Sequence, residues 1–223
     1  MSSSIQLTIF DLDGTLLNTV ADLANATNYA LAQCSFPTHP TSSYYKFVGN
    51  GINRLFYRAL PENARTETNI KHIRDLFVPY YNIHNTDESV PYPGITTLLE
   101  HLQESGILIA IASNKYQQAT ENLIKHFFPQ IQFAAILGQR EGVPIKPDPT
   151  IINDILKVTG IKHDNTLYIG DSGVDMQTAL NANVKSIGVT WGFRTKEELM
   201  AHDAKWIAHT ANDIITIIET YTE

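Results

Sequence analysis

The chain has 223 residues, a formal net charge of −7 and a hydrophobic fraction of 43%. This length suits one large domain, or one domain with a small insert. The excess of acidic residues argues against a nucleic-acid-binding surface, which requires clustered Lys and Arg. Apolar runs such as Ile107–Ala112 are too short to span a bilayer. We therefore expect a protein that binds neither nucleic acid nor membrane.

Two further features indicate where the protein works. The segment Met1–Ser4 lacks the basic start and the long apolar stretch of a signal peptide. The single cysteine, Cys34, cannot form an intrachain disulfide, which fits a reducing compartment. The sequence thus predicts a cytoplasmic protein.

The most informative stretch lies near the N-terminus. The apolar run Ile5–Phe10 predicts a buried strand that ends at Asp11. Asp11 and Asp13 lie two positions apart, so their side chains point to the same side, and Gly14 suits the tight turn that follows. Two carboxylates placed in this way repel each other unless a cation or a proton separates them. A site at the carboxyl end of a buried strand is also where open α/β sheets bind their ligands.

A helical block follows this stretch. Apolar residues recur at helical spacing after Val20, over Ile52–Leu60 and from Ile70 to Tyr81, and no segment before about Glu88 has the pattern of a strand. We therefore predict a small all-α helical insert after the first strand. The expected division is a core of residues 1–18 and 91–223 and an insert of residues 19–90.

From Pro91 onward, helical and strand patterns alternate. Such alternation predicts a doubly wound, parallel (Rossmann-like) α/β sheet with helices on both faces. The expected strands are Ile107–Ala112, Phe133–Leu137, Thr166–Ile169, Ser186–Val189 and Trp206–Ala208, and the expected helices are Thr96–Ser105, Gln117–His126, a helix after Pro149, Val174–Ala182, Lys196–His202 and Ala211–Glu219.

Polar residues follow four of these elements. They are Asp11 and Asp13, then Ser113 and Asn114, then Lys146, and finally Asp171 and Asp175. In a parallel sheet, the carboxyl ends of the strands converge on one edge, so we expect these side chains to share a cavity. Asp11, Asp13 and Asp171 offer the hard oxygen ligands that Mg²⁺ prefers. Ser113 and Lys146 offer donors for a phosphoryl group.

This set of residues can carry out phosphoryl transfer. One carboxylate can attack phosphorus and form an aspartyl-phosphate, and another can protonate the leaving oxygen. Each piece after the first has an ordinary alternative: Ser113 and Asn114 could begin a helix, Lys146 could be exposed, and acids near a helix start are favourable in any case. Their order, at successive strand ends, is what favours a common site.

The whole set resembles the haloacid dehalogenase-like hydrolases, and in particular their phosphoglycolate phosphatase-like family. That resemblance implies that Asp11 is the nucleophile and Asp13 the general acid/base. It also implies that Mg²⁺ is bound by Asp11, the backbone carbonyl of Asp13, and Asp171. Ser113 and Asn114 would hold the phosphoryl group. The resemblance further implies that Lys146 neutralises the phosphoryl group. Asp175 would act indirectly, by orienting Lys146 or through a water molecule.

The resemblance also implies a small phosphorylated metabolite as substrate, with 2-phosphoglycolate as the leading candidate. The position of the helical insert also resembles the cap of these hydrolases. The cap residues that could contact the far end of the substrate are Asn50, Lys46 and Arg54. A surface position is an equal alternative for Lys46 and Arg54. The protein is expected to be a monomer or a homodimer. Pyrophosphate, nucleotides and sugar phosphates remain alternative substrates within the same resemblance.

Two other functions use similar residues. A phosphomutase of the β-phosphoglucomutase type shares the cap and the acid pair, but it needs specific basic cap groups that the sequence does not identify. A phospho-accepting receiver-type signalling domain also places acids, a lysine and Mg²⁺ at strand ends. Receiver domains are about half this length and lack a helical insert, so this alternative fits the chain less well.

Overall fold

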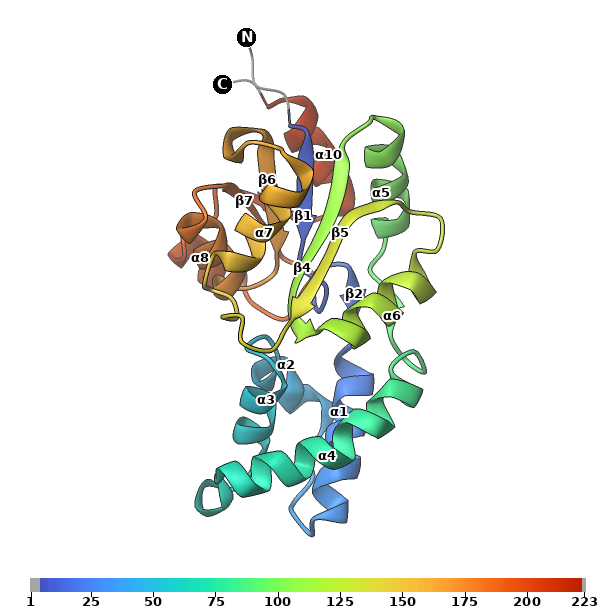
Figure 1. Ribbon diagram of the computed structural model, residues 1–223, viewed down its shortest axis with the longest axis vertical. Coiled ribbons are helices and arrows are strands. Elements are labelled where there is room, and N and C mark those ends of the chain that lie inside the picture. Colours follow the sequence, from blue (N-terminus) through green and yellow to red (C-terminus); the bar gives the residue numbers. More distant parts are fainter. Residues whose placement is uncertain (1–4, 222–223) are drawn as a thin grey trace.

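The computed structural model describes residues 5–221 and shows a sheet-containing body joined to a helical one (Figure 1). The expectation about a signal peptide falls on Met1–Ser4, which lie outside the described residues. Within the described range, no helix is both long enough and apolar enough to cross a membrane.

The larger body is built on a six-stranded parallel sheet. Its strand order is β5-β4-β1-β6-β7-β8, with β1 in the middle. The strands are β1 (Leu7–Phe10), β4 (Leu108–Tyr116), β5 (Phe133–Gln139), β6 (Thr166–Gly170), β7 (Lys185–Val189) and β8 (Trp206–Ala208). The prediction of a doubly wound parallel sheet is therefore confirmed.

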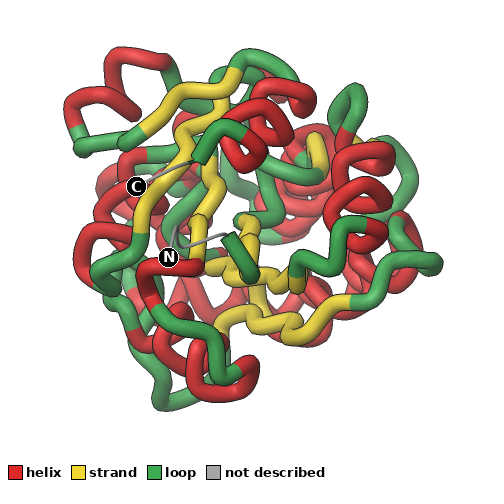
Figure 2. Tube along the Cα trace, turned by 90° about the horizontal axis from the view of Figure 1, so that it is seen from above, coloured by secondary structure: helices red, strands yellow, loops and turns green. Residues whose placement is uncertain are grey.

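Both faces of the sheet are covered by helices, as the apolar strands require (Figure 2). Successive residues of β1 pack on opposite sides: Ile9 joins one apolar cluster and Phe10 the other. The Phe10 side carries α5 (Ile95–Glu104), α6 (Gln117–Phe127) and α10 (Ala211–Glu219), and the Ile9 side carries α7 (Thr150–Thr159) and α8 (Gly173–Asn181). A shorter helix, α9 (Lys196–Ala201), precedes β8, and the 3₁₀ turn η2 (His163–Asn165) precedes β6.

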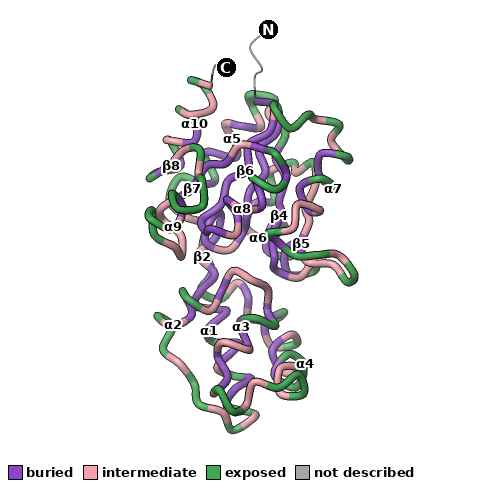
Figure 3. Tube along the Cα trace, turned by 90° about the vertical axis from the view of Figure 1, so that its left-hand side faces the viewer, coloured by how far each residue is buried: buried purple, intermediate pink, exposed green. Residues whose placement is uncertain are grey.

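The helical body is inserted after β1, as predicted. It consists of α1 (Val20–Gln33), α2 (Thr41–Phe47), α3 (Ile52–Ala59) and α4 (Glu67–His84), with the 3₁₀ turn η1 (Glu62–Ala64) before α4. These helices pack around an apolar cluster that includes Phe56 and Phe77. Figure 3 shows buried segments in the helical body as well as in the sheet-containing one. Helix α2 was not among the predicted helical segments, because proline, present here at positions 37 and 40, usually ends a helix. Pro40 instead occupies the position just before the helix, where its missing N–H costs nothing.

A two-stranded connection joins the two bodies. Strand β2 (Leu17–Asn18) leaves the sheet-containing body and pairs antiparallel with β3 (Val90–Pro91), which returns to it. Neither strand was predicted, because two residues are too few to show an alternating pattern. The pairing places both crossings of the chain side by side.

The carboxylate of Asp22 fastens this connection. Asp22 lies in the first turn of α1 and is buried, and its oxygens accept the backbone N–H of Glu88 at 3.0 Å and that of Ser89 at 2.8 Å. The Ser89 hydroxyl donates a further bond of 2.6 Å. A buried carboxylate that accepts several donors ties the two crossings together more strongly than neutral bonds would.

We expect Asp22→Ala to lower the free energy of unfolding by about 3 kcal/mol, because it leaves buried N–H groups without their charged acceptor. Urea unfolding followed by circular dichroism measures this. The control is Asp75→Ala, which removes an exposed carboxylate paired with Lys71 and should change stability by about 0.5 kcal/mol or less. Equal losses in the two variants would contradict the role assigned to Asp22.

Candidate active site

The strand order brings the predicted acids together. Strand β1 lies between β4 and β6. Along the chain, β4 and β5 are added on one side of β1, and β6, β7 and β8 are added on the other, so the strand order reverses at Asp11. This reversal is where doubly wound sheets form a binding crevice. One cavity opens there, lined from the sheet-containing body by Asp11, Asp13, Ser113, Asn114, Lys115, Asp171, Ser172, Phe193 and Arg194, and from the helical body by Leu23, Val48, Gly49, Gly51, Ile52 and Leu55.

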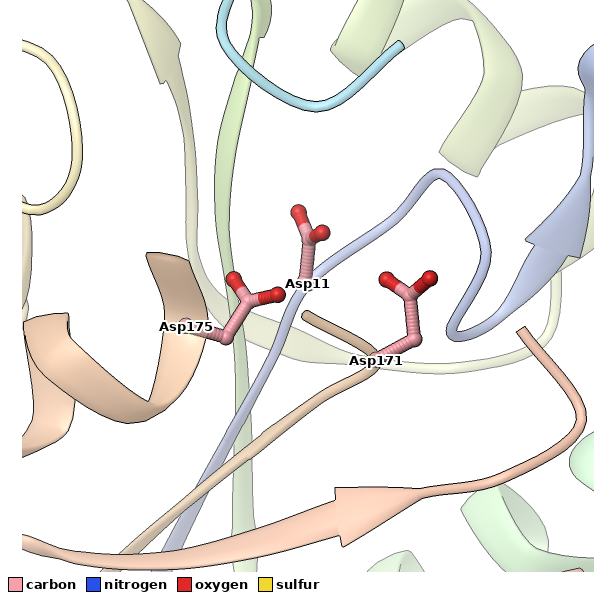
Figure 4. A group of neighbouring side chains, drawn as sticks. All are labelled: Asp11, Asp171 and Asp175. Atoms are coloured by element: carbon pink, nitrogen blue, oxygen red, sulfur yellow. The ribbon is translucent and has the colours of Figure 1, made fainter. Parts of the chain in front are cut away.

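Three carboxylates form the acidic centre of the site. Oxygens of Asp11, Asp171 and Asp175 lie within 4.8 Å of one another. Figure 4 shows the three side chains pointing to the same side, with Asp11 between the other two. Asp11 follows β1, Asp171 follows β6, and Asp175 stands in the first turn of α8.

Asp171 is held between two glycines. A Cβ at Gly14 would lie 2.4 Å from its Oδ2 atom, and one at Gly192 would lie 2.3 Å from its Cβ. The backbone N–H of Phe193 donates to Oδ2 at 2.7 Å, and the hydroxyl of Thr15 is 3.4 Å from Oδ1. Gly14 also has φ of +89°, so the turn after β1 needs glycine for two reasons.

Lys146 lies beneath the acids and is almost fully buried. Its Nζ is 2.9 Å from Asp11 Oδ1 and 2.7 Å from Asp175 Oδ1, and it also donates to the Tyr168 hydroxyl and the Ala112 carbonyl. Burial alone would lower the pKa of Lys146, but Asp11 and Asp175 outweigh this effect and raise that pKa above its ordinary value. Lys146 is therefore a permanent positive charge at the base of the site.

Asp175 is saturated by these contacts. Its Oδ1 accepts bonds from Lys146 and Tyr168, and its Oδ2 accepts the N–H and the hydroxyl of Ser172 at 3.1 and 2.6 Å. A carboxylate with four donors has little capacity left for a ligand. Among the three clustered acids, Asp11 and Asp171 are thus the ones available to a cation, and Asp175 orients Lys146.

The residues Ser113 and Asn114 lie within β4, although the predicted strand ended at Ala112. The strand continues to Tyr116, and its pairing with β5 has an irregular register between Ala112 and Tyr116. The polar residues lie within this bulge. Asn114 Oδ1 accepts the Lys146 backbone N–H at 2.9 Å, and its amide group donates to the Gly49 carbonyl at 3.2 Å. Asn114 therefore connects three segments that surround the cavity.

Asp13 has a separate set of partners. Its Oδ2 is 2.9 Å from Lys115 Nζ, and its Oδ1 accepts the Thr19 hydroxyl at 2.6 Å. The side chain of Asp13 thus lies apart from the cluster formed by Asp11, Asp171 and Asp175, while both aspartates line the same cavity.

The acidic centre fits a divalent cation. Burial raises the pKa of Asp11 to about 7, since Lys146 only partly offsets burial and the neighbouring Asp175. Burial, followed by Asp175 and Asp11, raises the pKa of Asp171 well above its ordinary value. Among the described residues, no Lys or Arg forms an ion pair with Asp171. A cation with hard oxygen preferences would relieve this uncompensated charge.

The three predicted cap residues do not line the cavity. Asn50 Oδ1 accepts a bond of 2.8 Å from Arg58, and the Arg54 guanidinium lies 4.7 Å from the centre of the Tyr57 ring. Lys46 stands in the last turn of α2 and is exposed. The helical body instead presents to the cavity the apolar side chains of Val48, Ile52 and Leu55. Their neighbour Gly49 contributes backbone.

Sequence reasoning missed three contributors to the site: Tyr168, Phe193 and Arg194. It placed Lys115 in the same run as Ser113 and Asn114 but gave it no role. Tyr168 lies within a strand whose pattern indicates only burial. Phe193 acts through its backbone N–H, and Arg194 reaches the carbonyl oxygens of Tyr45 and Val48 in the helical body. No pattern in the sequence indicates such contacts.

These features define a phosphoryl-transfer type of site. It has a parallel α/β sheet, an acid pair after the central strand, a buried lysine and a third acid after β6. The comparisons agree with this geometry. The family model described as haloacid dehalogenase-like hydrolase matches residues 8–189. The chain belongs to the haloacid dehalogenase-like hydrolase family. This membership confirms the resemblance found in the sequence, and it decides against the receiver-type alternative.

Individual relatives are similar to this chain over 90% or more of its length. A phosphoglycolate phosphatase of Mannheimia succiniciproducens is 30% identical over 98% of this chain and all of its own. One from Mesorhizobium japonicum is 30% identical over 90% of this chain and 89% of its own. Among solved structures, a proposed phosphoglycolate phosphatase of Lactobacillus delbrueckii subsp. bulgaricus has a TM-score of 0.89 and 33% identity, covering 98% of this chain and 99% of its own.

The raised carboxyl pKa values predict how stability depends on pH. A carboxyl group whose pKa is raised by folding favours the folded state fully below its unfolded pKa, and this contribution is lost as the pH rises through the folded pKa, about 7 for Asp11. In EDTA, we expect the thermal midpoint to decrease as the pH rises from about 4 to about 7. Added Mg²⁺ should restore more stability at the higher pH, because it binds the ionised carboxylates.

Differential scanning calorimetry at several pH values, with EDTA and with Mg²⁺, measures this effect. The matched variant is Asp171→Asn, which removes one ionisable carboxyl from the cluster and should flatten the pH dependence in EDTA. A Mg²⁺ effect of the same size at every pH in the unmodified protein would contradict the explanation.

Proposed function

We propose that this protein is a Mg²⁺-dependent phosphatase that hydrolyses a small phosphorylated metabolite through an aspartyl-phosphate on Asp11, with 2-phosphoglycolate as the leading candidate substrate. The single observation that carries the proposal is the arrangement around Asp11. Its carboxylate lies in a common cavity with Asp13, and it is 2.9 Å from the buried ammonium group of Lys146.

Asp11 is the proposed nucleophile because it lies between Asp171 and Asp175 (Figure 4) and beside the Lys146 ammonium group. An oxygen of Asp11 attacks phosphorus, and the bond from phosphorus to the leaving oxygen breaks. Lys146 stabilises negative charge on the transferring phosphoryl group, and its contacts with Asp175 and Tyr168 fix its direction.

Asp13 is the proposed general acid/base. It lines the cavity but has partners different from those of Asp11, so it can act on the leaving oxygen while Asp11 attacks phosphorus. The proton of the Asp13 carboxyl group passes to the leaving oxygen. Asp13 then takes a proton from the water that hydrolyses the aspartyl-phosphate, which releases phosphate and restores both acids.

The residues that would hold Mg²⁺ are Asp11 and Asp171, with the backbone carbonyl of Asp13. When bound, Mg²⁺ supplies charge screening, which lets a carboxylate approach a phosphate ester. Ser113 and Asn114 are the proposed phosphoryl-binding residues. Ser113 lines the cavity at the bulge of β4, and Asn114 holds the Lys146 backbone in place beside it.

The helical body is the proposed cap, covering residues 19–90. Its apolar wall of Val48, Ile52 and Leu55 lies across the cavity from the acids and would exclude water during transfer. Asn50, Lys46 and Arg54 stay the proposed cap contacts for a substrate that reaches beyond this wall. A half-buried, unpaired Cys34 is consistent with a reducing cytoplasm as the place of action.

The substrate class can be tested with a panel of phosphate compounds. It contains 2-phosphoglycolate, pyrophosphate, nucleoside monophosphates, hexose phosphates and p-nitrophenyl phosphate, each with Mg²⁺ and with EDTA. We expect Mg²⁺-dependent phosphate release, led by 2-phosphoglycolate. If another compound of the panel released phosphate fastest, it would replace 2-phosphoglycolate as the proposed substrate, and the proposed mechanism would stand. Conversion of a hexose 1-phosphate to the 6-phosphate without phosphate release would indicate a phosphomutase.

Asp11→Asn should reduce turnover by at least about a thousandfold, because the amide cannot attack phosphorus. Phosphate release with the best substrate of the panel measures this loss, and circular dichroism checks that the fold is intact. A folded Asp11→Asn variant that retains substantial activity would rule out Asp11 as the nucleophile.

Asp171→Asn should raise the Mg²⁺ concentration needed for half-maximal activity at least about tenfold, since it removes a charged ligand. A Mg²⁺ titration of phosphate release measures the shift. Asp164→Asn is the matched control, because Asp164 is an exposed acid in the turn before the same strand, β6. If the Asp171→Asn titration coincides with that of the unmodified enzyme, Asp171 is not a metal ligand.

A further inference from the structure

One buried lysine in the cavity has no role in the mechanism above. Lys115 has a side chain that is 2% exposed, and its Nζ is 2.9 Å from Asp13 Oδ2. The other oxygen of Asp13 accepts the Thr19 hydroxyl at 2.6 Å. Each oxygen of Asp13 thus has one donor, and the two donors come from two different segments of the chain. Two such bonds fix the rotation of a carboxylate.

The backbone of Lys115 is itself held in place. Its N–H donates to the Ser113 hydroxyl at 3.2 Å, and its carbonyl accepts the Thr120 hydroxyl at 3.3 Å. Lys115 therefore extends from a fixed point at the bulge of β4. A long lysine side chain is normally mobile, and burial between fixed partners removes that mobility.

The second partner of Lys115 belongs to the helical body. Its ammonium group lies 4.9 Å from the centre of the Tyr81 ring, which is within the range of a cation–π contact. Tyr81 comes from α4, is fully buried, and stacks on Phe77 of the same helix at 5.0 Å. The neighbouring residues repeat this connection, since the Tyr116 hydroxyl donates to Asn82 Oδ1 at 2.7 Å.

The Tyr81 hydroxyl is a further sign that this contact matters. It is buried and has no hydrogen-bond partner among the described residues. Burial, followed by the charges of Asp13 and Asp22, raises the pKa of Tyr81 well above its ordinary value, so the group stays a neutral phenol. A buried hydroxyl without a partner is costly, and the ring that carries it packs against Lys115.

We infer that Lys115 is a positioning residue that aims the Asp13 carboxyl at the leaving-group oxygen, and that α4 holds Lys115 in place through the ring of Tyr81. This inference rests on the proposed function, because it concerns the acid/base of that reaction. It also gives closure of the helical body a direct effect on chemistry: the acid is aligned only when Tyr81 covers Lys115.

The consequence depends on the leaving group. An alkyl oxygen is strongly basic and needs a proton as it departs, so a misaligned Asp13 should slow its departure. The p-nitrophenolate ion is weakly basic and departs without one. Hydrolysis of the aspartyl-phosphate also uses Asp13, so loss of alignment should make that second step slow for every substrate.

The test uses Lys115→Met, which keeps the length of the side chain and removes its charge. For the fastest alkyl ester of the panel, kcat/KM should fall about 10- to 100-fold, within the range that acid/base groups contribute. For p-nitrophenyl phosphate, kcat/KM should stay within about threefold. Stopped-flow absorbance should show a burst of p-nitrophenolate about equal to the enzyme concentration, because the phosphorylated enzyme accumulates.

Further variants separate positioning from structure. Lys115→Arg should recover most of the lost activity, since it keeps a charged donor. Tyr81→Leu, which removes the ring, should show the same leaving-group dependence in a weaker form. Lys125→Met is the matched control, an exposed lysine of α6, and should change nothing. In an Asp13→Asn background, Lys115→Met should cause no further loss.

Two outcomes would overturn the inference. An equal loss for both kinds of leaving group, without a burst, would make Lys115 a structural or phosphate-binding residue. Unchanged kinetics for Lys115→Met would give it no part in the reaction. If the unmodified enzyme hydrolysed no ester of the panel, the proposed function itself would be wrong. Because that result comes from the unmodified enzyme, the two failures are distinguishable.

Discussion

The site depends on one buried cation. Lys146 lies between Asp11 and Asp175 at distances of 2.9 and 2.7 Å, and it is the only ammonium group among the described residues that contacts the acidic cluster of Asp11, Asp171 and Asp175. A buried lysine is costly unless it is paired and hydrogen-bonded. Here the acids, the Tyr168 hydroxyl and the Ala112 carbonyl satisfy it. The same pairing lets three buried carboxylates lie close together.

The negative charges of the site are not all matched by positive ones. Lys146 compensates Asp11 and Asp175, and Lys115 compensates Asp13, but Asp171 has only neutral donors among the described residues. The raised pKa values of Asp11 and Asp171 express this deficit. A divalent cation is the simplest species that would remove it, since protons would disable the nucleophile. Membership of the haloacid dehalogenase-like hydrolase family and the electrostatics of the site thus lead to the same expectation.

The helical body contributes to the site in two distinct ways. Val48, Ile52 and Leu55 close the cavity with apolar surface. Tyr81 and Asn82 contact the end of β4, while Arg194 of the sheet-containing body reaches the carbonyl oxygens of Tyr45 and Val48. The two bodies are therefore joined by specific contacts beside the acidic site, as well as by apolar surface that lines the cavity. The paired strands β2 and β3, fastened by Asp22, are the connection through which the two bodies are linked.

The sequence by itself determined the class of fold and the acids that line the cavity. Buried strands and helices have distinct apolar periods, and Asp11, Asp13 and Asp171 follow strands in an order that a parallel sheet brings to one edge. Only the tertiary structure decided the partners of each group. It separated Asp175, which is saturated by Lys146 and Ser172, from the acids available to a cation. It also turned Asn50 and Arg54 toward neighbours within the helical body and brought Lys115 to Asp13. Such pairings depend on side-chain directions between segments far apart in the chain, which no local pattern encodes.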